Sequence, residues 1–103
     1  MLIARVEGSV VATKKNDKMT GRRMVLVRPF VVSEPGAQSF KPASTTLVAY
    51  DALGAGTGEL VLVVQGSSAR LAAPDKDTPV DAVVIGIVDS VDCGKTKLYS
   101  SGA

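Results

Sequence analysis

The chain has 103 residues, the length of one domain, and its net charge of +2 is too small to indicate nucleic-acid binding by itself. It has no histidine, which removes the usual general base, the usual zinc ligand and any histidine-activated nucleophile. Hydrophobic residues make up 46% and aromatic residues only 4%, so we expect a single domain, residues 1–103, with a core of Val, Leu, Ile and Ala.

The first third of the chain has strand-like patterns. Apolar and polar residues alternate over residues 2–13, which predicts a strand with one buried face, and Gly8 within it predicts a bulge or sharp bend. A polar turn then leads to a second predicted strand, residues 24–32. Pro29 interrupts this strand, which favours an edge position or a bulge, because proline has no backbone donor.

The rest of the chain completes a predicted all-β fold. Residues 33–45 are rich in Ser, Pro, Gly and Lys, which predicts a loop. The elements expected after it are strands over residues 46–51, 59–65 and 82–91, a small terminal strand over 97–100 and one helical turn over 68–73. About five short strands with glycine-rich turns indicate a small closed or partly open five-stranded β-barrel.

The strand predicted over residues 59–65 is apolar on both faces, as is much of the strand over 82–91. Because side chains alternate along a strand, these leucines and valines cannot all share one face, and both faces need cover. One face would line the barrel interior. In a chain with few helices, we expect a neighbouring copy to cover the other face, which predicts an oligomer.

Two glycine-rich turns bracket the short apolar segment 60–65. The first turn, DALGAGTGE at residues 51–59, has the composition of a phosphate-binding loop. Its glycines are spaced Gly-x-Gly-x-Gly, however, no Lys-Ser or Lys-Thr pair follows them, and a strand rather than a helix comes next. The pattern therefore favours a tight turn or a subunit contact over a nucleotide site.

No set of residues stands out as a catalytic or metal site. Ser67 and Ser68 would need a lysine or carboxylate base to act as nucleophiles, so a turn or helix-cap role for one of them is favoured. Arg70 could bind an anion, but pairing across an interface with a carboxylate such as Glu59 is favoured. Strand-end caps or solvated carboxylates explain the remaining scattered aspartates: Asp51, Asp81, Asp89 and Asp92. We therefore predict no enzyme activity, no cofactor and no metal.

A cluster of basic residues surrounds the first polar turn. Its members are Lys14, Lys15, Lys18, Arg22 and Arg23. A solvated loop is the favoured interpretation, and the alternative is an OB-fold binding module that holds single-stranded nucleic acid. Such a module needs exposed aromatic platforms, and the four aromatic residues are scattered along the chain.

The single cysteine and the short apolar runs indicate a cytoplasmic protein. Cys93 has no partner for an intrachain disulfide. The longest apolar run, residues 82–88, is far shorter than the roughly 18–20 residues that a membrane helix needs. We therefore expect no membrane association.

Several tracts in a fixed order resemble the small vertex proteins of bacterial microcompartment shells, the family of the ethanolamine-utilisation and carboxysome vertex proteins. They are ARVEGSVVATK at residues 4–14, TGRRMVLV at 20–27, GAGTGE at 54–59, GSSAR at 66–70, and PVDA at 79–82 followed by GIVD at 86–89. Each tract is weakly specific, but their order and separation make the resemblance strong over most of the chain. The loop at residues 33–46 is long for the family, and the tail after Cys93 is not distinctive, so the resemblance leaves the pathway and cargo of the shell open.

The resemblance implies an OB-like β-barrel that assembles as a cyclic homopentamer. Such pentamers occupy the vertices of a cytoplasmic polyhedral shell, beside hexameric and trimeric shell proteins, and have no chemistry of their own. The expected subunit or shell contacts are Gly54, Gly56, Gly58, Glu59, Gly66, Ser67, Ser68 and Arg70. A small serine hydrolase that uses Ser67 or Ser68 ranks below both the shell protein and the nucleic-acid module.

Overall fold

The computed structural model describes residues 1–13, 17, 21–31, 41–73 and 80–101, apart from the side chain of Arg70. Nearly all the regular structure is β-strand. The elements in chain order are β1 (Leu2–Val10), β2 (Met24–Val31), β3 (Lys41–Pro42), β4 (Leu47–Asp51), β5 (Leu60–Gln65), α1 (Ser67–Ala72), β6 (Ala82–Ile87), β7 (Ser90–Cys93) and β8 (Thr96–Ser100). No helix in these described ranges is both long and apolar enough to cross a membrane.

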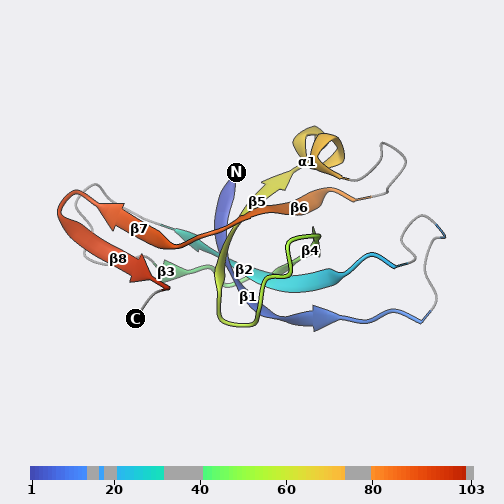
Figure 1. Ribbon diagram of the computed structural model, residues 1–103, viewed down its shortest axis with the longest axis horizontal. Coiled ribbons are helices and arrows are strands. Elements are labelled where there is room, and N and C mark those ends of the chain that lie inside the picture. The colour runs from blue at the N-terminus through green and yellow to red at the C-terminus, as the bar shows by residue number, and fades with distance from the viewer. Residues whose placement is uncertain (14–16, 18–20, 32–40, 74–79, 102–103) are drawn as a thin grey trace.

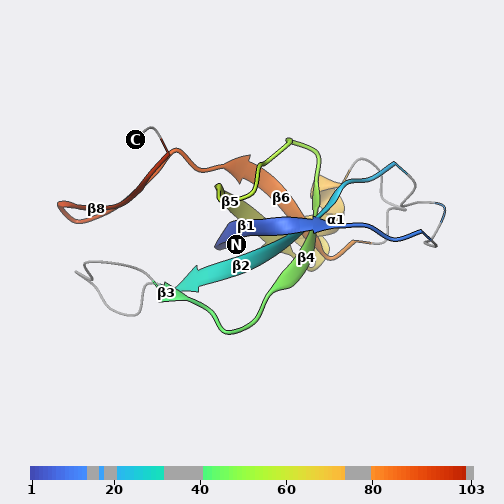
Figure 2. The ribbon, with the colours of Figure 1, turned by 90° about the horizontal axis from the view of Figure 1, so that it is seen from below.

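Five strands close into a barrel, which confirms the predicted fold class. Their order is β1-β5-β6-β4-β2, and pairing of β1 with β2 completes the circle (Figures 1 and 2). All the pairings are antiparallel except that of β4 with β6, which run parallel. The short strand β3 extends the sheet beside the end of β2 and was not predicted, because its two residues lie within a polar loop sequence.

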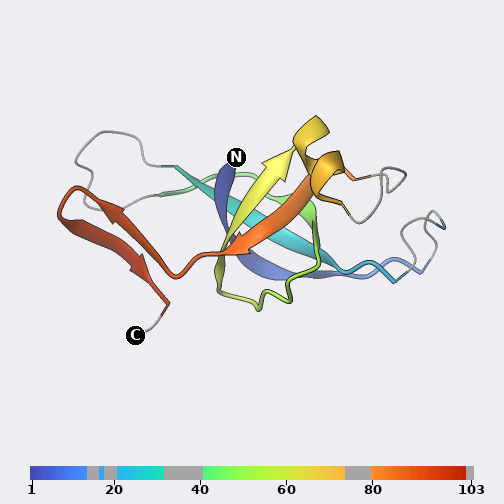
Figure 3. The same ribbon diagram turned by 45° about the horizontal axis from the view of Figure 1, so that its top comes forward.

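The molecule is elongated, with extents of 46 × 25 × 24 Å, because two β-hairpins extend from the barrel in opposite directions (Figures 1 and 3). The ends of β1 and β2 continue together as an arm at one end. The β7–β8 hairpin lies at the other end and forms a separate two-stranded sheet. The predicted single strand over residues 82–91 is therefore wrong: it ends at Ile87, and a new strand begins at Ser90.

Small aliphatic side chains fill the barrel interior, as the composition predicts. The largest side chains that are fully buried are Val6, Val25, Val27, Val61 and Val63. They come from β1, β2 and β5, and each lies two residues from another inward-facing position, as expected for strands with one face inside. The barrel is thus a packed core that has no aromatic side chain in its main cluster.

The first two strands have irregularities near the two predicted positions. The register of β1 against β2 shifts between Val6 and Gly8, which confirms a bulge there. Pro29 lies within β2, where Ala4 on β1 is its partner, and its carbonyl accepts a hydrogen bond from the Ala43 backbone at 2.8 Å. On the side of β2 that faces away from β1, the strand changes partner from β4 to β3. Pro29, which has no backbone N–H, lies in the gap between these two ladders rather than at an edge strand or a bulge.

The outer face of β5 is covered in part by the chain itself, which corrects the expectation that a neighbouring copy covers it. Val64 on β5 and Val83 on β6 pack with Tyr50, and α1 supplies the fully buried Ala69 to this second cluster. The short helix therefore acts as a lid over one end of the β5–β6 surface. Elsewhere on the outer surface, Ile85 on β6 remains 40% exposed, so only part of this surface is left for a neighbouring copy to cover.

Candidate functional site

The candidate site begins with the loop of residues 52–59, which joins β4 to β5 and crosses one end of the barrel (Figures 1 and 3). Asp51, the last residue of β4, organises it. Its Oδ1 atom accepts hydrogen bonds from the backbone N–H groups of Leu53 at 2.9 Å and Gly54 at 3.2 Å, and its Oδ2 atom accepts one from Ala55 at 2.8 Å. An aspartate side chain that binds backbone donors a few residues later is a common turn-forming device.

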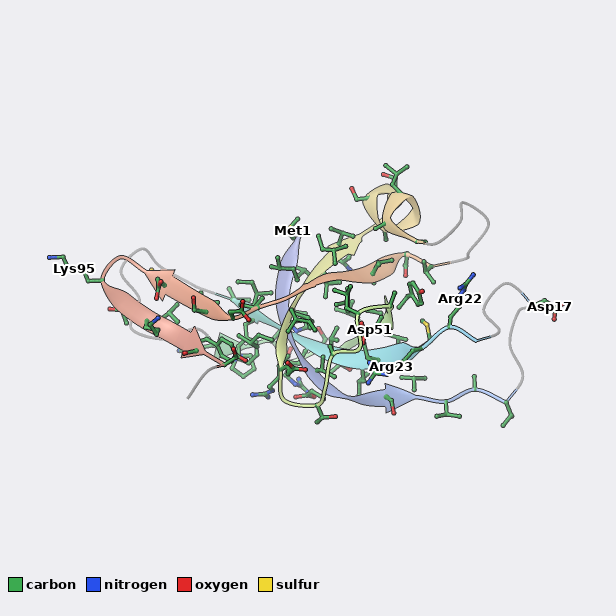
Figure 4. The ribbon with its side chains drawn as sticks, viewed as in Figure 1. Met1, Asp17, Arg22, Arg23, Asp51 and Lys95 are labelled. Atoms are coloured by element: carbon green, nitrogen blue, oxygen red, sulfur yellow. The ribbon has the colours of Figure 1, made fainter. Side chains whose placement is uncertain are left out.

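The Asp51 carboxylate also forms an ion pair with the Arg23 guanidinium, and the two side chains lie beside one another in Figure 4. The Asp51 side chain is fully buried, whereas that of Arg23 is 43% exposed. Burial of a carboxylate is costly unless it is paired and hydrogen-bonded, and Asp51 meets both conditions. The expectation that Asp51 caps a strand end is confirmed, but this residue is not solvated.

The second half of the loop is attached to β1 and closed by a tight turn. The Gly58 N–H donates to the Val6 carbonyl at 2.8 Å, and the Val6 N–H donates to the Glu59 carbonyl at 2.9 Å. Within the turn, Glu59 Oε1 accepts a hydrogen bond from the Gly56 N–H at 2.5 Å. Ala55, between these attachments, is 1% exposed and belongs to the barrel core. The loop is thus held at both ends and in its middle.

Two glycines of the loop have backbone conformations that other residues rarely adopt. Gly54 has φ of +83° and Gly58 has φ of +93°, both in the left-handed region. A Cβ atom at either position would meet no other atom of the chain within 4 Å, so the space beside them is open. Gly56 differs, because its Cβ would lie 3.2 Å from Glu59 Oε1. The first turn therefore needs glycine mainly for its backbone angles.

The second glycine-rich turn lies at the other end of β5, so the structure does not bring the two turns together. Gly66 is the N-cap residue of α1, with φ of +67°, and no side chain caps this helix. Ser67 and Ser68 are exposed residues of the first helical turn, so the predicted cap role for a serine is wrong. The Arg70 side chain lies outside the described residues, and with it the predicted pairing with Glu59.

An arginine cluster on the outer face of β1 and β2 was not anticipated. Arg28 Nε lies 3.1 Å from both carboxylate oxygens of Glu7, and Arg5 Nη2 lies 3.1 Å from one of them. The Arg28 hydrogen bonds, and then the Arg5 hydrogen bond, lower the pKa of Glu7. The Arg5 guanidinium also stacks 5.2 Å above the Phe30 ring. Alternation along two paired strands was the signal that could have grouped these residues.

The basic cluster of the first turn is described only in part, since Lys14, Lys15 and Lys18 lie outside the described residues. Arg22 and Arg23 line a hollow of about 390 Å³ at the base of the β1–β2 arm. The rest of its lining is Ser9, Val10, Val11, Ala12, Gly21 and Met24. No three His, Cys, Asp or Glu side chains of the described ranges form a group that could hold a metal.

Comparison with known proteins identifies close relatives over nearly the whole chain. Residues 1–89 match the family model described as "Ethanolamine utilisation protein EutN/carboxysome". The chain is 44% identical to the bacterial microcompartment shell vertex protein PduN of Salmonella typhimurium, over 90% of this chain and 100% of PduN. Its fold is similar to that of CcmL of Gloeobacter violaceus, with a TM-score of 0.85, 41% identity and 100% coverage of both chains. It is also similar to GrpN of Rhodospirillum rubrum, described as a pentameric microcompartment shell protein, with a TM-score of 0.74, 37% identity and coverage of 89% of this chain and 99% of GrpN.

Proposed function

Because the chain belongs to the EutN/CcmL family, we propose that it is a shell vertex protein of a bacterial microcompartment and assembles as a cyclic pentamer. The observation that carries this proposal is the likeness in fold and sequence to GrpN, a pentameric shell protein. The relatives are named as vertex proteins of carboxysomes and of other bacterial microcompartments, so their names do not point to one cargo.

The proposed mechanism is geometric. Hexameric and trimeric shell proteins would form the facets, and a five-fold unit inserted among six-fold units introduces the curvature that a flat sheet lacks. This task needs a rigid wedge-shaped subunit rather than a reactive site. The protein would act in the cytoplasm as part of the shell, without a cofactor and without catalysis.

The loop of residues 52–59 and the start of α1 are the proposed subunit or shell contacts. The loop presents Leu53, which is 50% exposed, on a backbone that Asp51 fixes before any partner arrives. A contact on a fixed loop loses less conformational entropy on assembly than one on a mobile loop. Open space beside Gly54 and Gly58 leaves room for a neighbouring backbone. The remaining contact residues of the proposal are Gly56, Glu59, Gly66, Ser67, Ser68 and Arg70.

Native mass spectrometry over a range of protein concentrations tests the pentamer. The expected species has five times the protomer mass, whereas a monomer at every concentration would overturn the proposal. Leu53→Asp is expected to reduce the pentamer fraction, because it places a charge in an apolar contact. Thr46→Asp, at the other end of β4, is the matched control and should leave the pentamer intact. A pentamer that tolerates Leu53→Asp would remove the loop from the interface.

Two of the three described aromatic side chains do not offer the nucleic-acid alternative a stacking platform. Arg5 covers the ring of Phe30, and Tyr50 is 6% exposed in the cluster beneath α1. Base stacking needs open aromatic faces, which these two residues do not offer. The relatives are named as shell proteins, so the vertex proposal is the one that we retain.

A further inference from the structure

The β7–β8 hairpin stands apart from the barrel. Its two strands pair with one another, and among the described residues neither pairs with a barrel strand. In Figures 1 and 3 it projects from the end of the molecule opposite the β1–β2 arm. It also lies beyond residue 89, where the match to the family model ends.

The hairpin has one polar and one apolar face. Its exposed residues are Ser90, Asp92, Lys97 and Ser100, which lie opposite one another in two cross-strand pairs. The alternate positions are half-buried and hold Val91 opposite Tyr99, and Cys93 opposite Thr96. The register shifts between Val91 and Asp92, which leaves Leu98 as the extra residue of a bulge. Such alternation is typical of a hairpin that packs one face against another layer.

A single two-stranded hairpin is marginally stable in water and needs a third strand or a packed face for independent stability. Among the described residues, no third strand pairs with β7 or β8, and the apolar positions of the hairpin are only half-buried. Further cover for this face is available from another molecule, and in a homopentamer the nearest candidate is a second copy of this chain.

The opposite end of the molecule offers an apolar surface of a different shape. Val10 is 37% exposed and Val11 is 87% exposed on the β1–β2 arm, and both line the hollow of about 390 Å³. A head-to-tail contact joins two different surfaces of one chain and generates a ring when the rotation closes. A hairpin at one end and a hollow at the other are such a pair.

Charge also favours contact between unlike ends. Arg22 and Arg23 line the hollow, and none of its described lining residues is acidic, so two hollows placed together would bring like charges together. Residues 89–101 contain two aspartates and two lysines, so the hairpin end is neutral overall. The cationic arm is thus better matched by the hairpin end than by a second arm.

We propose that the apolar face of the β7–β8 hairpin packs into the hollow at the base of the β1–β2 arm of the next protomer. This inference rests on the proposed pentamer and adds a second contact to that of the glycine-rich loop. Val91 and Tyr99 enter the apolar contact, and Cys93 becomes buried beside them.

The reactivity of Cys93, the only cysteine of the chain, tests this contact in the wild-type protein. In the native pentamer, alkylation of Cys93 by iodoacetamide is expected to be at least about tenfold slower than in protomers dissociated by dilution, because reaction must wait for local opening. A matched control is Ser100→Cys in a Cys93→Ser background, which places the thiol on the polar face and should react at the same rate in both states. Equal rates for Cys93 in pentamer and protomer would overturn the inference.

A charge exchange then identifies the two surfaces. Tyr99→Lys alone and Val11→Asp alone are each expected to reduce the pentamer fraction in native mass spectrometry, and the double variant is expected to restore it. Circular dichroism of each variant separates loss of assembly from loss of folding. If the wild type is monomeric, the proposed function itself fails. If the wild type is pentameric but Cys93 reacts freely, or the double variant restores nothing, only the hairpin contact fails.

Discussion

Arg23 and Asp51 are joined twice, once through the backbone and once through their side chains. The Asp51 N–H donates to the Arg23 carbonyl at 2.9 Å, and the Arg23 guanidinium pairs with the Asp51 carboxylate. The same carboxylate holds the backbone of Leu53, Gly54 and Ala55. The start of β2, the end of β4 and the glycine-rich loop are therefore connected through one buried side chain.

Asp51→Asn is expected to lower the free energy of unfolding by about 1–3 kcal/mol. The amide can accept fewer of the three backbone hydrogen bonds and no longer pairs with Arg23. Chemical denaturation of the isolated variant measures the loss, and amide hydrogen exchange at Ala55 localises it. The control is Asp92→Asn, because that side chain is 58% exposed and its ion pair with Lys97 is long, at 3.8 Å. Equal effects of the two substitutions would contradict the assigned role of Asp51.

Gly54→Ala is expected to destabilise the fold by about 1–2 kcal/mol, because an L-residue is disfavoured at a φ of +83°. For a domain of this size, each kcal/mol lowers the melting temperature by roughly 4–8 °C. Gly8→Ala is the matched control, since Gly8 has no positive φ and a Cβ there would meet nothing within 4 Å. A melting temperature of Gly54→Ala equal to that of the wild type would exclude the left-handed turn.

Ala69→Leu is expected to cost about 1–3 kcal/mol of stability through overpacking. Ala69 is fully buried beneath α1, where it packs with Val64 and Val83. Ala72→Leu lies on the same helix at an exposed position and should change stability little. Thermal melting of the two variants compares them, and equal melting temperatures would mean that α1 does not cover the β5–β6 surface.

Glu7→Gln is expected to reduce the acid sensitivity of the fold. The pKa of Glu7 is lowered from 4.5 by hydrogen bonds from Arg28 and Arg5, so the folded state binds fewer protons than the unfolded state. The stabilisation is complete above the unfolded pKa and disappears as pH falls through the lower folded pKa. Melting curves of wild type and variant should therefore differ at pH 7 and converge at acid pH. A constant difference at all pH values would contradict this linkage.

The closed barrel was predictable because its strands have clear hydrophobic patterns and are separated by glycine-rich or polar turns. Gly8 indicated the bulge in β1, and the two glycine-rich turns set the limits of β5. The end of β6 was not predictable in the same way. Residues 82–88 form one apolar run, and neither Val88 nor Asp89 is a strong strand breaker, so the change from the barrel to the hairpin has no local signal.

The covering of β5 by α1 and the geometry of the candidate site depend on contacts between residues that are far apart in the chain. A local sequence pattern does not predict such contacts. α1 has six residues, too few for an amphipathic pattern to reveal that Ala69 faces the barrel. The ion pair of Arg23 with Asp51 joins residues 28 positions apart. The sequence located the glycine-rich turns at the two ends of β5, but only the fold shows that the first turn is attached to β1 and, through Asp51, to β2.

The parallel pairing of β4 with β6 is the shortest ladder of the barrel, with Tyr50 opposite Val83 and Asp51 opposite Val84. With two residue pairs it has the least backbone pairing of the closed sheet, and it joins strands that are distant in the chain, whereas the β1–β2 ladder is a hairpin. Chain entropy opposes such distant pairings, and only two residue pairs offset that cost here. Asp51 belongs both to this ladder and to the glycine-rich loop, so separation of β4 from β6 would displace the side chain that holds the loop. A partner that binds the loop would therefore also stabilise the pairing of β4 with β6.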